Sequence, residues 1–196
     1  MPQLYKKALQ VEFFNVGYNM GEAVVAILAG KAAESIALIG FGFDSIVESL
    51  SGFILIWRLS RHGKRSSHDE KKIERVATKF VGISFFVLAL YITFASVRKI
   101  LFREPPDPSL VGIILAIASL VIMPVIATTK LRIAKKLELR SLVADSKETF
   151  VCSLLSAALL VGLLTNYFFD FWLSDPLVGL IISGYLIYEG RELLFE

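Results

Sequence analysis

The sequence contains little cysteine and little charge, and both shortages limit what the protein can be. A single cysteine, Cys152, excludes an internal disulfide. Charged residues make up 20% of the 196-residue chain, against 55% hydrophobic residues and a mean hydropathy of +0.65. The chain also lacks a nucleotide-binding glycine loop, a nucleophile paired with a base and a metalloprotease motif. Nothing in the sequence therefore indicates an enzyme, and the composition is not that of a soluble domain.

The apolar residues are gathered in long blocks. Residues 77–96 contain one charge, Lys79, and the blocks 110–129 and 153–169 contain none. Each block approaches the ~20 residues with which a helix crosses a bilayer. Because a chain in lipid must satisfy its own backbone hydrogen bonds, these blocks predict helices. We therefore expect an all-α polytopic membrane protein, a bundle of six transmembrane helices over residues 9–28, 34–57, 77–96, 110–128, 142–165 and 176–188.

The predicted spans leave little room for anything else. We expect residues 1–196 to form a single transmembrane domain with no C-terminal cytoplasmic domain. Lys6 and Lys7 precede a long apolar segment, not a short one with a small-residue cleavage site. The first segment is therefore expected to remain as a membrane helix.

Lysine and arginine are distributed unevenly between the two ends of the predicted bundle. Fifteen lie at one end of the bundle, in the N-terminal segment, in the connections after the second and fourth spans, and after the sixth span. Lys130, which follows the fourth span, is one of these fifteen. Four lie at the other end. Because cytoplasmic loops carry the excess of positive charge, we expect both termini to be cytoplasmic in a multi-pass protein of the cell membrane. The net charge of +3 then reflects orientation in the lipid bilayer and not nucleic-acid binding.

Two carboxylates stand where lipid makes them costly. Asp44 and Glu48 lie inside the second span, where an ionisable group costs roughly 2.5–3.5 kcal/mol on insertion scales. Their spacing of four places them on one helix face, where like charges repel. They need a cation, a proton or a basic partner, and we expect no central lysine or arginine to supply one. Gly40 and Gly42 precede Asp44 and would let another helix approach closely.

The fifth predicted span carries a matching polar face. Asp145, Glu148 and Cys152 cover a narrow arc at 100° per residue. The second and fifth spans run in opposite directions, so Cys152 can be placed opposite Asp44. This register also sets Glu148 level with Glu48, and it leaves Asp145 about one helical level closer to the cytoplasm. The four level side chains would meet at one point and form a metal site.

Several polar side chains also have a purely structural interpretation. The first span carries a polar stripe of Glu12, Asn15, Asn19 and Glu22. Glu12 lies near the helix end and most simply stabilises the bundle by a hydrogen bond to a neighbouring helix. Glu22 fits a structural role or a place on the ion pathway equally well. Cys152 taken alone is typical of a small core residue. His62 and His68, in the basic connection, fit either a solvated loop or a place of metal capture.

Longer sequence patterns surround these residues. Residues 35–48 read SIALIGFGFDSIVE, residues 144–152 read ADSKETFVC, and Asp175-Pro176-Leu177 opens the sixth span. These segments resemble the cation diffusion facilitator (cation efflux) family, whose second helix reads S-x-A-L-x-A-D-G-x-[HD]-S-x-x-D and whose fifth reads A-D-x-x-H-x-x-x-D. The resemblance covers the six-helix region, as a short form with the transmembrane domain only.

The resemblance implies a homodimeric exporter that exchanges divalent metal ions for protons. The family's ligand positions fall on Asp44, Glu48, Glu148 and Cys152. Asp145 and Glu22 are candidates for additional positions along the pathway. Zn²⁺ is the expected cargo, with Cd²⁺, Mn²⁺, Fe²⁺ and Co²⁺ as alternatives.

Three positions depart from the family pattern. Glu148 stands where the family usually has histidine, Cys152 where it has aspartate, and Phe41 where it often has aspartate. Loss of the imidazole weakens the argument for zinc, and the thiol restores part of it.

Two other functions remain open at this stage. The chain could be a non-transporting, metal-binding membrane accessory or assembly protein, whose acidic seam only assembles a complex. It could also carry a different cationic substrate. Transport in sealed vesicles separates the first alternative from a transporter, and competition by metals separates the second.

Overall fold

The described residues form six α-helices. The structure, a computed structural model, describes residues 2–60, 67–103, 107 and 109–195. The helices are α1 (Pro2–Ala32), α2 (Ile36–Ser60), α3 (Ser67–Phe102), α4 (Leu110–Leu137), α5 (Arg140–Phe169) and α6 (Ser174–Phe195). No strand occurs within these ranges, and the expected all-α class is confirmed.

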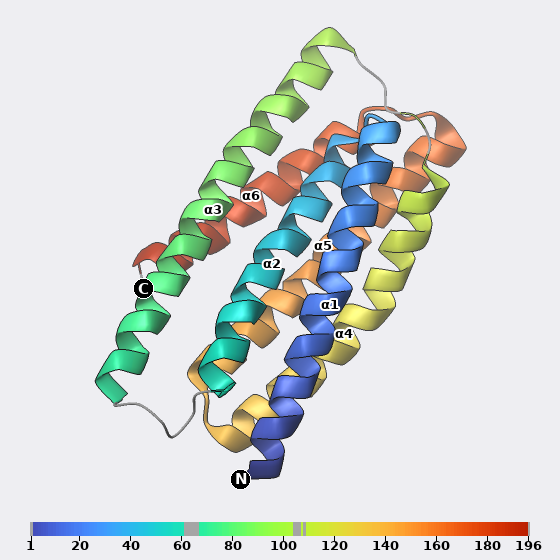
Figure 1. Ribbon diagram of the computed structural model, residues 1–196. Helices are drawn as coiled ribbons and strands as arrows, with labels where there is room; N and C mark the ends of the chain where they lie inside the picture. Colours follow the sequence, from blue (N-terminus) through green and yellow to red (C-terminus); the bar gives the residue numbers. More distant parts are fainter. Residues whose placement is uncertain (1, 61–66, 104–106, 108, 196) are drawn as a thin grey trace.

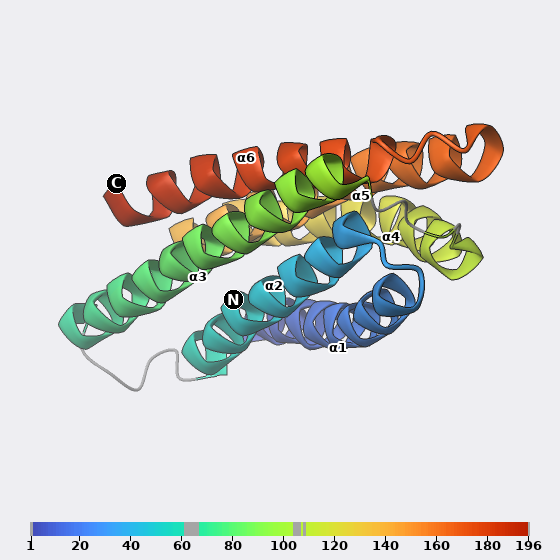
Figure 2. The same cartoon turned by 90° about the horizontal axis from the view of Figure 1, so that it is seen from above.

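Consecutive helices run in opposite directions (Figure 1). Helix α1 packs along α2 and α4 packs along α5, and contacts between α1 and α4 and between α2 and α5 join these pairs into a four-helix group. Helices α3 and α6 form a third pair, seen along one side of the bundle in Figure 2. The N-terminus, the end of α2 and the turn between α4 and α5 share one end of the bundle (Figure 1). Helix α2 is central, because it contacts α1, α3, α5 and α6.

Composition alone identifies fewer membrane helices than the fold contains. Within the described residues, four helices are long and apolar enough to cross a membrane: α2, the Phe85–Phe102 part of α3, α4, and the Ser141–Phe169 part of α5. Helix α1 is not among these four, yet its Glu12 and Glu22 are buried inside the bundle. The helices are also longer than the predicted spans. Helix α6, for example, covers 22 residues, where only 176–188 was expected.

Polar and apolar side chains are distributed in the manner of a membrane protein. Large apolar side chains on α3 and α4 point outward: Leu90, Leu101, Ile114 and Val121 are each more than 60% exposed. Small polar side chains are fully buried instead, among them Asn15, Asn19, Ser45, Thr149 and Ser156. In water such an apolar surface would demand a partner, whereas in a bilayer lipid covers it. The all-α membrane bundle predicted from the sequence is therefore confirmed.

Glycines on α2 allow its neighbours to approach closely, as the sequence predicts. A Cβ at Gly42 would lie 2.7 Å from Cγ1 of Ile27 on α1, and one at Gly40 would lie 2.8 Å from Cδ1 of Ile92 on α3. Both distances are shorter than real Cβ contacts, so a side chain at either position would force the neighbouring isoleucine to move. The two glycines therefore leave room for side chains of α1 and α3 close to this part of α2.

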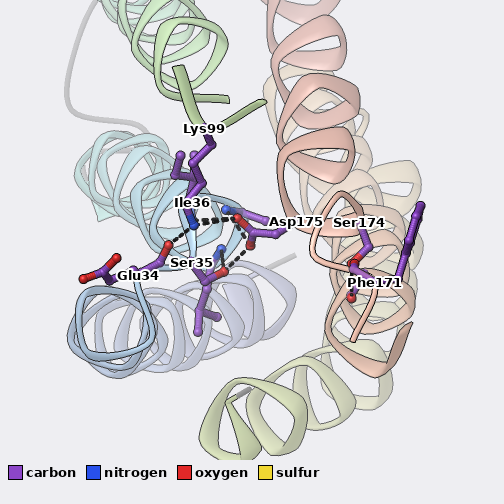
Figure 3. A network of polar contacts seen from close by, with 10 residues as sticks. Glu34, Ser35, Ile36, Lys99, Phe171, Ser174 and Asp175 are labelled. Atoms are coloured by element: carbon purple, nitrogen blue, oxygen red, sulfur yellow. Dashed lines mark hydrogen bonds and ion pairs between the residues drawn. The ribbon is translucent and has the colours of Figure 1, made fainter. Parts of the chain in front are cut away.

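A carboxylate from α6 caps α2 at the bundle end opposite the N-terminus (Figure 3). Asp175 accepts hydrogen bonds from the Ser35 hydroxyl and from the backbone N–H groups of Ile36 (3.1 Å) and Ala37 (3.4 Å). The first N–H groups of a helix have no partner within the helix, and an aspartate oxygen is well suited to accept from them. The start of α2 is thereby held by α6.

A buried lysine completes this network from α3. Lys99 Nζ lies 3.5 Å from Asp175 Oδ2 and donates to the backbone carbonyl oxygen of Glu34. Lys99 and Asp175 are 4% and 3% exposed, so the pair is shielded from solvent. The ion pair and the cap together tie α2, α3 and α6 to one another.

Replacement of Asp175 by alanine should lower the free energy of unfolding by about 3–5 kcal/mol, because it leaves the Lys99 charge buried without its partner. Equilibrium unfolding in detergent micelles measures this difference. Asp107→Ala is the matched control, since the Asp107 side chain is exposed, and it should change the stability little. Equal stabilities of the two variants would remove the structural role of Asp175.

Candidate metal site

The polar faces of α2 and α5 meet in the register that the sequence predicts. The Thr149 hydroxyl of α5 donates to Glu48 Oε1 of α2 at 2.7 Å, and the Ser51 hydroxyl of α2 donates to Glu148 Oε2 at 3.1 Å. Cys152 lies one helical turn further along α5, beside both Asp44 and Glu48. The two helices therefore present the four candidate ligands to each other at matching levels.

These four side chains are enclosed by the bundle. Asp44, Glu48 and Cys152 are 7%, 2% and 2% exposed, and Glu148 is half-buried. Across the described residues, however, no group of three or more histidine, cysteine, aspartate or glutamate side chains lies in an arrangement that could hold a metal ion. The side chains are neighbours but do not converge on one coordination point, so the ligand assignment stays a prediction.

Some carboxylate oxygens at this level have no hydrogen-bond partner. Glu48 Oε2, Glu148 Oε1 and Glu22 Oε1 are buried and make no hydrogen bond. A buried acceptor without a donor is costly, and native proteins rarely leave one unexplained. Three such oxygens lie on three helices, α1, α2 and α5, of the described bundle.

Helix α1 contributes two polar contacts to this region. Ser45 Oγ donates to Glu22 Oε2 at 2.8 Å, and Asn15 Nδ2 donates to Glu48 Oε1 at 3.2 Å. The polar stripe of the first span therefore packs against the face of α2 that carries Asp44. Glu22 therefore contacts Ser45, the residue that follows the candidate ligand Asp44.

A buried lysine from α4 corrects one expectation from the sequence. Lys130 is 1% exposed, and its Nζ lies 2.5 Å from Asp145 Oδ2 and 3.2 Å from Glu12 Oε2. The fourth span was expected to end at residue 128, with Lys130 in the cytoplasmic loop and no basic side chain near the buried carboxylates. That expectation was wrong because α4 continues to Leu137.

The sequence did contain a signal for Lys130. The buried positions along this part of α4 are Met123, Ile126, Ala127, Lys130, Ile133 and Ala134. They recur at intervals of three and four, which is the period of one helix face. Lys130 continues the buried stripe of the apolar block, and this periodicity predicts burial where hydropathy alone suggests a loop.

Helix α6 adds two residues that the sequence analysis did not select. The Tyr185 hydroxyl donates to Glu189 Oε2 at 2.8 Å. Glu189 is close enough to Asp44 to interact with it electrostatically, and Tyr185 is close enough to both Asp44 and Glu148. Glu189 was missed because the sixth span was expected to end at Tyr188.

The two histidines for which a solvated loop and metal capture both stayed open cannot be placed relative to the site. His62 lies outside the described residues, as does the side chain of His68. Their assignment stays a prediction.

The fold and the site together define a class of protein, a helical membrane bundle with buried, incompletely paired carboxylates on facing helices. The model of the cation efflux transmembrane domain matches residues 13–196. The chain therefore belongs to the cation efflux family, whose members are transporters of metal cations.

Curated relatives are similar over most of this chain. It is 23% identical to transmembrane protein 163 of Xenopus laevis over 193 residues, which cover 97% of this chain and 67% of that protein. It is 26% identical to an uncharacterized transporter of Synechocystis and 27% identical to one of Methanocaldococcus jannaschii, over 83% and 84% of this chain. These matches cover 54% and 59% of the two transporters, so the chain spans about half to two thirds of the length of these relatives.

Proposed function

We propose that this protein moves divalent metal cations, zinc first among them, across a membrane in exchange for protons. The site lies between α2 and α5, with Asp44, Glu48, Glu148 and Cys152 as ligands. The observation that carries the proposal is the set of buried carboxylate oxygens without partners on these facing helices, in a chain of the cation efflux family. A cation bound between the two helices would neutralise these carboxylates and accept electron pairs from their oxygens.

The donor set favours zinc and cadmium. Carboxylate oxygens bind most divalent ions, whereas a thiolate selects softer metals. Cys152 lies next to Asp44 and Glu48, and zinc binds sulfur and oxygen ligands in a tetrahedral arrangement. The contacts between Thr149 and Glu48 and between Ser51 and Glu148 hold the two faces together and support a site between α2 and α5.

Proton exchange follows from the same ligands. Metal binding requires deprotonated carboxylates and thiolate, so protons and metal compete for one set of groups. Alternating exposure of the site to the two sides of the membrane then exchanges the metal ion for protons. The reaction moves ions and makes or breaks no covalent bond.

Both termini face the cytoplasm in this proposal, and the ion leaves the cell. The fifteen-to-four asymmetry of lysine and arginine supports this orientation, and Figure 1 shows the N-terminus and the α4–α5 turn at one end. In a Cys152→Ser background, a cysteine replacing the exposed Lys136 should react with an impermeant reagent only from the cytoplasmic side. A cysteine replacing the exposed Asp107 should react only from outside. The opposite pattern would reverse the direction of transport.

Metal uptake by the purified protein in sealed liposomes tests the proposed function. Zn²⁺ should accumulate when a proton gradient is imposed, and Cd²⁺ should compete for the same flux. Binding of Zn²⁺ without any flux would instead identify a metal-binding accessory protein. Cross-linking of the reconstituted protein tests the homodimer that the family resemblance implies, and a strictly monomeric active protein would exclude it.

A further inference from the structure

Three helices meet at Lys130 of α4. Its ammonium lies between Asp145 Oδ2 of α5 at 2.5 Å and Glu12 Oε2 of α1 at 3.2 Å, and it also donates to Thr149 Oγ1 at 3.1 Å. The Lys130 and Glu12 side chains are completely buried, and the Asp145 side chain is 4% exposed. A single ammonium therefore serves two carboxylates in a place that solvent does not reach.

Thr149 connects this lysine to the proposed metal site. Its hydroxyl receives a hydrogen bond from Lys130 and donates one to Glu48 Oε1 at 2.7 Å. Asn15 Nδ2 also donates to Glu48 Oε1, so this oxygen has two donors while Glu48 Oε2 has none. The contacts hold one oxygen of Glu48 in place and leave the other free to bind an ion.

We propose that Lys130 is a tethered cation that occupies a second cation position beside the metal site. It keeps Glu12 and Asp145 from binding cargo, and it positions Glu48 through Thr149. This proposal rests on the proposed function only for the identity of the cargo at Glu48. Lys130 is thus a positioning and specificity residue, and it does not touch the transported ion.

The geometry around Nζ suits a divalent ion in the absence of the lysine. Carboxylate oxygens bind Zn²⁺ at about 2.0–2.2 Å, so Asp145 Oδ2 at 2.5 Å and Glu12 Oε2 at 3.2 Å would each move by about 1 Å or less. Glu12 Oε1 and Asp145 Oδ1 are buried and without hydrogen-bond partners. The two carboxylates and the Thr149 hydroxyl therefore form a ready set of oxygen ligands that the ammonium occupies.

Lys130→Met should create a second metal site. Methionine matches the length of the lysine side chain without its charge, and it releases both carboxylates. The full chain in lipid nanodiscs, stripped with a chelator and dialysed against Zn²⁺, should bind one ion per chain as wild type and two as Lys130→Met. Lys130→Arg, which keeps the charge, should bind one. Lys130→Met combined with Asp145→Asn should return the count to one.

An unchanged count of ions in Lys130→Met would overturn the proposal. Asp44→Asn separates this failure from a failure of the proposed function, because it should remove the ion at the α2–α5 site only. If the proposed site holds no ion, Asp44→Asn leaves the wild-type count unchanged, and Lys130→Met still gains one ion.

Thr149→Val tests the connection to Glu48 without disturbing the ion pair. Valine has the same shape as threonine, and removal of a residue that orients a metal ligand costs about 10–100-fold in metal affinity. Zn²⁺ should therefore bind about 10–100-fold more weakly to Thr149→Val, still with one ion per chain. Thr149→Ser keeps the hydroxyl and should restore the affinity. Wild-type affinity in Thr149→Val would exclude positioning through Thr149.

Discussion

Asp44→Asn should reduce zinc transport in proteoliposomes to the rate of protein-free vesicles while the protein remains folded. The substitution removes one negative charge from a buried group of ligands and replaces a carboxylate by a neutral amide. Loss of a residue that merely orients a ligand costs about 10–100-fold in metal affinity, so loss of a ligand should cost at least about 100-fold. Zinc uptake under an imposed proton gradient, with the helix content of the variant measured by circular dichroism, gives the comparison.

Asp170→Asn is the matched control for Asp44→Asn. Asp170 is exposed at the end of α5 with a φ of 50°, a backbone conformation that asparagine also adopts readily. The same chemical change at this position should leave transport at the wild-type rate. Wild-type transport by Asp44→Asn would remove Asp44 from the site, and equal losses in both variants would point to a defect in folding or insertion.

Cys152→Asp should keep transport but shift its selectivity from cadmium toward manganese. The aspartate is the usual residue of the family at this position, and it makes the set of ligands entirely oxygen. Thiolate favours cadmium and zinc, whereas carboxylate suits manganese, so the ratio of cadmium to manganese affinities should fall by about tenfold or more. Calorimetric titration of wild type and variant with each ion measures this ratio.

Cys152→Ala distinguishes a ligand from a packing residue. The buried thiol lies beside two carboxylates, and it also belongs to the apolar core together with Leu155 and Leu159 of the same helix. If Cys152 binds the ion, alanine should weaken zinc binding more than manganese binding. Equal and small changes for all metals would contradict this role and leave the three carboxylates as ligands.

The buried lysine alters how the charges of the bundle balance. The sequence suggests a group of carboxylates that only protons or metal ions can neutralise. The structure divides these carboxylates between two neighbouring sets. Glu12 and Asp145 share the Lys130 ammonium, whereas the oxygens of Glu22, Glu48 and Glu148 that lack partners have no lysine or arginine among their described contacts. Glu48 and Glu148 of the second set are among the proposed ligands of the transported ion.

Much of this protein was determined by the sequence alone. Charge-free blocks of nearly 20 residues favour helices in lipid, because a helix forms all of its backbone hydrogen bonds within itself. Asp44 and Glu48 share a face because they are four residues apart, and so do Glu148 and Cys152. The opposite directions of the two helices then gave their register, which the Thr149–Glu48 contact shows directly. All of these inferences depend on the regular geometry of single helices.

Only the tertiary structure decided which charges are paired. Lys130 follows an apolar block and resembles a residue of a basic loop, and its partners Glu12 and Asp145 lie on helices that the sequence does not bring together. In the same way, Lys99 meets Asp175 across 76 positions of the chain. The energy of a buried charge depends on the groups within a few ångströms of it, and those groups come from several helices. Spacing along one helix fixes a face, whereas the packing of helices fixes the electrostatic partners of that face.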